Sequence, residues 1–233
     1  MSNFQEIRDH QNWLGFLQPD GLVVSPAALV DSGIYYDTNL RERQLDLHQH
    51  LRDLQLWDEK SEPKISNLPA FFTDYLEWQQ DDFVSGEDVP ESLCIFIKGY
   101  DESLAPSHAV KDPDNQGAFH LLVLETSAED LDKPADENTK GWHVSPTKRF
   151  ERLLRETNVS IGLLSNGTHL RLIYAPAGEN PGSITFPVAG MSEIAGRPIL
   201  GGFRMLLDDY RLFRAVEKET LPAILQKSRD FQA

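Results

Sequence analysis

The stretch that decides the fold covers residues 145–174 and has the sequence SPTKRFERLLRETNVSIGLLSNGTHLRLIY. Its opening Ser145-Pro146 pair is typical of a helix start, and apolar residues follow at helical spacing. Two apolar runs then flank Asn166-Gly167, and an Asn-Gly pair between such runs is the strongest local signal of a β-hairpin. The stretch therefore predicts a helix that ends near Asn158, followed by two antiparallel strands.

The flanking sequence supplies further elements on both sides of this core. Apolar runs at 93–97 and 119–124 predict strands, and the second run is apolar on both faces, as in the middle of a sheet. Helices are predicted at 39–54 and 68–76, a strand at 183–186, and a helix at 202–226 that kinks or restarts at Pro222. We therefore expect an α+β (three-layer α/β) fold with a central mixed sheet and flanking helices. Its helical part would cover residues 1–90 and its sheet core with the C-terminal helices residues 91–233, as one compact unit.

Composition limits the class of protein. The chain has 233 residues, of which 40% are hydrophobic and 25% charged, enough to bury a substantial core. No apolar run approaches the roughly 18–20 residues that a membrane helix needs, and the first residues lack a secretory signal. Cys94 is the single cysteine, which excludes a disulfide framework and a cysteine-based zinc site. The expectation is a soluble cytoplasmic protein with no membrane partner.

Charge is divided unevenly along the chain. Residues 1–142 carry 10 basic and 28 acidic side chains, a net of −18, whereas residues 143–233 carry 12 and 9, a net of +3. The acidic part repels a polyanion such as DNA. This excess fits ordinary solubility charge, docking on a basic partner, or docking on a basic domain of the same polypeptide, and composition does not choose among them.

The basic residues concentrate in and after the predicted helix. Three of them, at 148, 152 and 155, share one face of that helix, where they can contact DNA phosphates or simply be solvated. The candidate DNA-binding residues are Lys148, Arg149, Arg152, Arg155 and Arg171.

A second set of residues partly matches a nuclease motif. In PD-(D/E)XK nucleases, an upstream acidic residue and a strand-end Glu-x-Lys hold Mg²⁺ and position the attacking water. Here the strand at 119–124 ends in Glu125, Asp112 or Asp114 lies upstream, and Ser127 stands in place of the lysine. Lys148 could substitute from the following helix. The weak catalytic candidates are therefore Asp114, Glu125 and Lys148 in a degenerate restriction-endonuclease-like fold, the alternative being that Glu125 only ends a strand.

Several runs together resemble a known family. They are Trp13-Leu14-Gly15-Phe16-Leu17-Gln18-Pro19, Gly21-Leu22-Val23-Val24-Ser25-Pro26, Gly141-Trp142-His143-Val144-Ser145-Pro146, Arg149-Phe150-Glu151-Arg152-Leu153-Leu154-Arg155-Glu156-Thr157, Gly162-Leu163-Leu164-Ser165-Asn166-Gly167-Thr168, Leu170-Arg171-Leu172-Ile173-Tyr174-Ala175-Pro176 and Ala195-Gly196-Arg197-Pro198-Ile199-Leu200. The chain resembles the N-terminal region of the large bacterial DNA methyltransferases of the Eco57I-like class. These adenine-specific enzymes use S-adenosylmethionine and occur in restriction-modification and DISARM-type phage-defence systems.

This resemblance implies a domain without the methylase chemistry. The family's Gly-rich cofactor loop and Asn-Pro-Pro-Tyr motif, which binds the flipped adenine, are both missing, so S-adenosylmethionine is expected only in a methylase domain outside this chain. We expect a non-catalytic N-terminal domain or fragment that positions DNA or a partner subunit. Its partners would be DNA and the methylase core, or helicase and other defence subunits. The alternatives are a residual Mg²⁺-dependent nuclease and a free-standing acidic interaction protein or DNA mimic, so whether the chain is an enzyme stays open.

Overall fold

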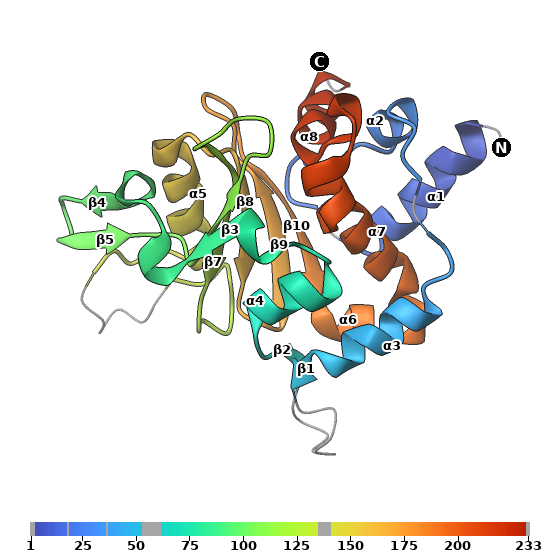
Figure 1. Ribbon diagram of the computed structural model, residues 1–233, viewed down its shortest axis with the longest axis horizontal. Coiled ribbons are helices and arrows are strands. Elements are labelled where there is room, and N and C mark those ends of the chain that lie inside the picture. The colour runs from blue at the N-terminus through green and yellow to red at the C-terminus, as the bar shows by residue number, and fades with distance from the viewer. Residues whose placement is uncertain (1–2, 18, 36, 53–61, 135–140, 232–233) are drawn as a thin grey trace. The chain divides into compact units, whose positions relative to one another are not determined.

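The computed structural model describes residues 3–17, 19–35, 37–52, 62–134 and 141–231 (Figure 1). Internal contacts divide the chain into two units. The first unit comprises residues 1–80, 167–169 and 183–233, and the second comprises residues 81–166 and 170–182. The C-terminal helices thus group with the N-terminal helices, whereas the sequence had placed them with the sheet. No helix in the described ranges is long and apolar enough to cross a membrane.

The first unit is mainly helical. Its helices are α1 (Asn3–Gly15), α2 (Pro26–Asp31), α3 (Arg41–Gln49), α4 (Leu68–Ala70), α6 (Val188–Ser192), α7 (Arg197–Leu207) and α8 (Leu221–Asp230). Two π-helical segments, η1 (Phe71–Tyr75) and η6 (Tyr210–Arg214), follow α4 and α7. Trp13 is fully buried and stacks on Phe186 at 6.5 Å between ring centroids. A Cβ on Gly202 would lie 2.4 Å from the Trp13 ring, so glycine lets α7 pack directly on the indole.

Six strands form a mixed sheet in the order β10-β9-β8-β7-β6-β3. Their bounds are β3 Phe83–Ser85, β6 His108–Lys111, β7 Phe119–Glu125, β8 Ile161–Ser165, β9 His169–Tyr174 and β10 Gly182–Pro187. Strands β7 and β8 pair in parallel, whereas β3–β6, β6–β7 and β8–β9 are antiparallel. Two short antiparallel pairs are not part of this sheet: β1 (Leu51–Arg52) with β2 (Lys64–Ile65), and β4 (Ile95–Ile97) with β5 (Glu102–Leu104). The predicted α+β class with a mixed sheet is confirmed.

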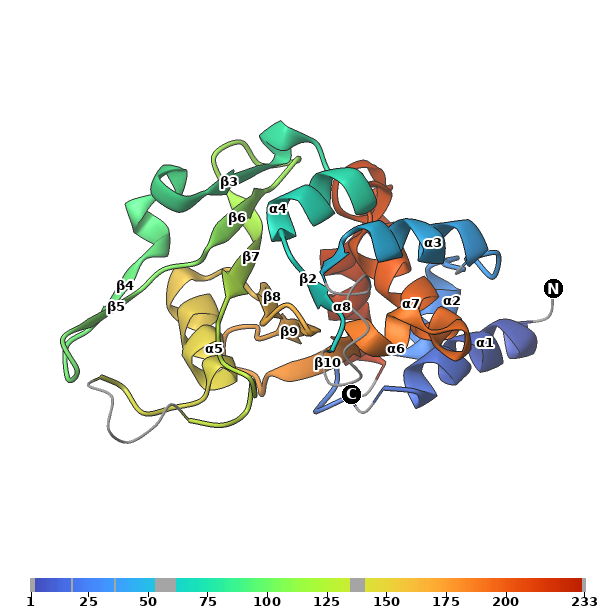
Figure 2. The same cartoon turned by 90° about the horizontal axis from the view of Figure 1, so that it is seen from below.

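Helix α5 (Pro146–Thr157) connects the two parallel strands and covers one face of them (Figure 2). The Ser145 side chain caps the helix by accepting from the Lys148 amide, and Asn158 ends it in a left-handed conformation. Phe150 and Leu154 of α5 are buried against the sheet. The predicted helix and its hairpin are both confirmed, because Asn166-Gly167 connects β8 to β9.

Other predicted elements differ in extent. The helix predicted at 39–54 stops at Gln49, Leu51 enters β1, and Leu54 falls outside the described residues. The helix predicted at 202–226 is instead α7, which starts at Arg197, then η6 and α8, because Asp208 has an extended backbone. Strands β3, β5 and β6 lie in stretches for which the sequence predicted no strand, since three or four residues carry little periodic signal.

Candidate functional site

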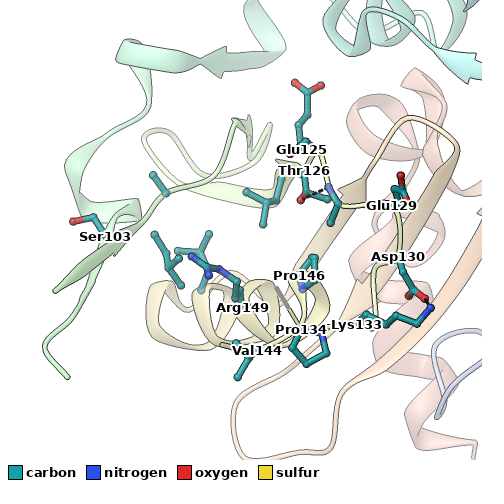
Figure 3. Close-up of a pocket in the computed structure, with 16 residues that line it drawn as sticks. Ser103, Glu125, Thr126, Glu129, Asp130, Lys133, Pro134, Val144, Pro146 and Arg149 are labelled. Carbon is teal, nitrogen blue, oxygen red and sulfur yellow. Dashed lines mark hydrogen bonds and ion pairs between the residues drawn. The ribbon is translucent and has the colours of Figure 1, made fainter. Parts of the chain in front are cut away.

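A cavity of the second unit lies at the carboxyl end of β7, beside the start of α5 (Figure 3). We call it the β7–α5 pocket. It has a volume of about 680 Å³, within the usual range for binding sites. It is bounded by β5 and the residue after it, by the end of β7, by the 126–134 loop and by α5. The apolar lining comes from Leu104, Ala105, Leu124, Ala128, Pro134, Val144, Pro146 and Leu153, and the polar and charged lining from Ser103, Glu125, Thr126, Ser127, Glu129, Asp130, Lys133 and Arg149.

The 126–134 loop is held in place by side chains from the hairpin and from α5. Asn166 Nδ2 donates to the carbonyls of Ala128 at 3.1 Å and Glu129 at 3.0 Å. Thr147 Oγ1 donates to the carbonyl of Leu131 at 2.8 Å. Arg171 donates with both terminal nitrogens to the Asp132 carboxylate, and these hydrogen bonds hold the pKa of Asp132 below its ordinary value. Since four residues of this loop are hydrogen-bonded to the hairpin or to α5, this wall is preorganised.

The opposite wall is organised around Arg149 and Glu102, which form an ion pair. Arg149 also donates to the Trp142 carbonyl at 3.1 Å, and the Trp142 amide donates to Glu102 at 3.0 Å. Burial lowers the pKa of Arg149, although its carboxylate partner keeps the charged form in place. Arg152 lies over the Trp142 ring at 5.0 Å. The pocket is therefore bounded on both sides by side chains whose polar groups already form hydrogen bonds or ion pairs within the protein.

Each of the predicted DNA-binding residues has an intramolecular partner. Lys148 pairs with Glu151 at 2.8 Å, Arg152 pairs with Glu156 at 2.7 Å, and Arg155 donates to the Glu179 carbonyl at 3.2 Å. Arg149 and Arg171 are the residues paired with Glu102 and Asp132. Four of the five charges are thus offset by a carboxylate within 4 Å, which weakens the positive field that DNA phosphates would meet.

The structure does not bring the nuclease candidates together. Asp114 lies in the turn before β7 and Glu125 at its far end, and seven strand residues span roughly 20 Å. Lys148 is bound to Glu151. In the described part of the chain, no three His, Cys, Asp or Glu side chains group as metal ligands. The arrangement provides no shared metal position for Asp114, Glu125 and Lys148.

Sequence reasoning missed a chain of hydrogen-bond contacts that crosses three strands. Ser85 Oγ lies 2.7 Å from His108 Nδ1, and His108 Nε2 lies 2.8 Å from Glu125 Oε1. The three residues come from β3, β6 and β7, and His108 is 5% exposed. These contacts depend on strand pairing between residues 17 to 23 positions apart, so no local sequence motif predicts them. These contacts hold the Glu125 side chain at the edge of the β7–α5 pocket.

Comparison of the chain with models of known protein families, with curated proteins and with solved structures gives no match.

Proposed function

We propose that this chain is a non-catalytic docking domain of an adenine-specific DNA methyltransferase in a restriction-modification or phage-defence system. In this proposal, the β7–α5 pocket receives a protein partner. One observation carries the proposal: the runs that resemble the methyltransferase N-terminal region supply the walls of this pocket. Trp142 and Arg149 organise one wall, and Asn166 and Arg171 hold the other.

The hydrogen bonds and ion pairs of the charged side chains support a docking role for the pocket over a catalytic one. Arg149 and Asp132 are engaged with Glu102 and Arg171, and Glu125 is held by His108. A reacting group needs to meet its substrate, whereas these groups are occupied in holding the pocket open. Much of the remaining lining is aliphatic, which suits an apolar side chain of a partner.

Electrostatics favours a protein partner over duplex DNA at this unit. Three of the four cations on α5 are paired with carboxylates, so phosphates would have to displace these carboxylates. The acidic excess of residues 1–142 instead complements a basic protein surface, such as the DNA-handling face of a methylase core. The docked domain would add its acidic surface to a complex whose other members contact DNA.

The test mixes the 233-residue chain with a methylase core that carries the cofactor loop and the Asn-Pro-Pro-Tyr motif. Calorimetry is expected to show a 1:1 complex, with a Kd of about 1 μM or below. Ala128→Trp fills the pocket and is expected to weaken the complex about tenfold or more, a loss of about 1.4 kcal/mol. The matched control is Gln116→Trp, which adds the same side chain to the exposed turn before β7.

Absence of a complex at 100 μM, a value about a hundred times the expected Kd, contradicts the proposal, as does an equal effect of the two tryptophan variants. Methyl transfer to duplex DNA separates the alternatives. A docking domain maintains or raises the rate, whereas a DNA mimic lowers it by occupying the DNA cleft. A residual nuclease would instead nick DNA with Mg²⁺ and lose this activity in Glu125→Ala.

A further inference from the structure

A second cavity lies wholly within the first unit and is lined by three arginines and two tyrosines. We call it the arginine pocket. Its volume is about 380 Å³, and it lies among the segment before α3, helix α3, helix α7 and η6. The side chains that matter here are Tyr35, Arg43, Arg204, Asp208, Tyr210 and Arg211. None of them belongs to the site considered above.

Two of the arginines are buried and are held by neutral groups. Arg204 is 8% exposed and donates to the Tyr75 carbonyl, while its guanidinium lies 5.0 Å from the Tyr75 ring centre. Arg211 is 7% exposed and donates from Nε to the Met205 carbonyl at 3.0 Å and from Nη1 to the Glu219 carbonyl. Main-chain carbonyls orient a guanidinium without cancelling its charge, so both side chains are fixed and still cationic.

Carboxylates around these arginines compensate them only in part. Glu77 pairs closely with the half-exposed Arg43 at 2.8 Å and lies 3.8 Å from Arg204. Asp208 accepts from the Arg211 amide at 3.0 Å, and burial raises the pKa of this carboxyl. Burial also lowers the pKa of Arg211. Within the described residues, Arg211 has no carboxylate oxygen within 4 Å of its guanidinium, which leaves a buried cation able to gain from an anionic ligand.

The rim of the pocket is aromatic. Tyr35 is 59% exposed and Tyr210 is 47% exposed, large apolar rings that solvent reaches. Tyr210 begins η6, a π-helical segment of the kind often found at functional sites, and the same segment carries Arg211. Arg211 lies 5.6 Å from the Tyr210 ring centre, which places charge and ring side by side. A planar ligand group can therefore stack on the rim while an anionic group reaches the guanidinium.

We propose that the arginine pocket binds a nucleoside phosphate, with the phosphate at Arg204 and Arg211 and the base against Tyr210 or Tyr35. Guanidinium forks match phosphate oxygens, and aromatic side chains beside a positive groove are how proteins hold unpaired nucleotides. A carboxylate ligand would use the arginines but not the rings. The ligand comes either as a free nucleotide or as one residue of a single strand, and the two share this chemistry.

The experiment uses the full 233-residue chain with two probes, adenosine monophosphate by calorimetry and a fluorescein-labelled 12-nucleotide single strand by anisotropy. Both are expected to bind, and each is expected to compete with the other. Tyr210→Ala is expected to weaken binding about 5- to 100-fold, the range for loss of one stacked base, whereas Tyr210→Phe keeps the ring and the affinity. Tyr100→Ala, which removes a similarly exposed tyrosine from the second unit, is the matched control and is expected to change nothing.

Arg211 is buried, so its replacement can disturb folding. Arg43→Gln, at a half-exposed position, is therefore the charge variant used. It is expected to weaken the binding of both probes and to lower the salt dependence of strand binding.

Equal affinity for both probes assigns the site to a free nucleotide, and tighter binding of the strand assigns it to nucleic acid. Failure of the wild-type chain to bind either probe overturns the proposal. So does binding of inorganic phosphate as tight as that of the nucleotide and unchanged in Tyr210→Ala. The methylase core is not in the assay, so this result is independent of the docking proposal.

Discussion

At the scale of single residues, Gly162 decides how closely α5 approaches the sheet. A Cβ at this position would lie 2.6 Å from Cε1 of Phe150 and 2.9 Å from a methyl of Leu154. Both neighbours are fully buried, so they have little room to move. We expect Gly162→Ala to lower the free energy of unfolding by about 1–3 kcal/mol, the cost of overpacking a core. Urea denaturation measures this directly.

The matched control is Gly99→Ala in the same unit, where nothing lies within 4 Å of the added Cβ. Its free energy of unfolding is expected to stay within about 0.5 kcal/mol of the wild type. If Gly162→Ala is as stable as Gly99→Ala, then the Phe150 side chain can move aside. The close approach of α5 to β8 would then not be essential to the packing of α5.

At the scale of elements, Asp132 ties the 126–134 loop to β9 through Arg171. Its pKa is lowered in the folded state by the hydrogen bonds from Arg171, so its contribution to stability is present above the unfolded pKa and is lost as the pH falls through the folded one. Because 62% of the Asp132 side chain is exposed, we expect Asp132→Asn to cost only about 0.5–1 kcal/mol at pH 7. Urea denaturation at pH 7 and at pH 2 is expected to show this difference at the first pH and not at the second.

The comparison carboxylate for this test is Asp130. It also has a lowered pKa, but through contacts with neighbouring residues of the same loop, and it does not bind β9. We expect Asp130→Asn to leave the attachment of the loop intact. An Asp132→Asn protein whose stability relative to the wild type does not change with pH would show that Arg171 finds another partner.

At the scale of the whole molecule, the chain carries a net charge of −15. Under the docking proposal, long-range attraction speeds the encounter with a basic methylase core and is screened by salt. Stopped-flow measurement is expected to show an association rate constant about tenfold lower at 300 mM than at 50 mM NaCl, with a much smaller change in the dissociation rate. Neutralising Glu87 and Asp88, two exposed acids, is expected to reduce the rate at low salt. A rate constant that does not respond to salt would remove electrostatic steering from the docking proposal.

The sequence by itself determined the elements whose signals are local. The cap at Ser145, the left-handed stop at Asn158 and the turn at Asn166-Gly167 act within a few residues, so α5 and its hairpin could be predicted with their bounds. The apolar run of β7 likewise predicted a central strand. These features follow from backbone geometry and side-chain periodicity, which are determined by residues close together in the sequence.

The tertiary structure alone decided the rest. Strands β3 and β6 are too short to carry a periodic signal. They are stabilised by strand pairing, β6 with β7 and β3 with β6. The basic cluster was visible in the sequence, but the neutralisation of Arg149 and Arg171 depends on Glu102 and Asp132, which lie 47 and 39 positions away. Both pockets are likewise built from segments far apart in the chain, because charge pairing and cavity shape depend on distance in space, which the order of residues does not specify.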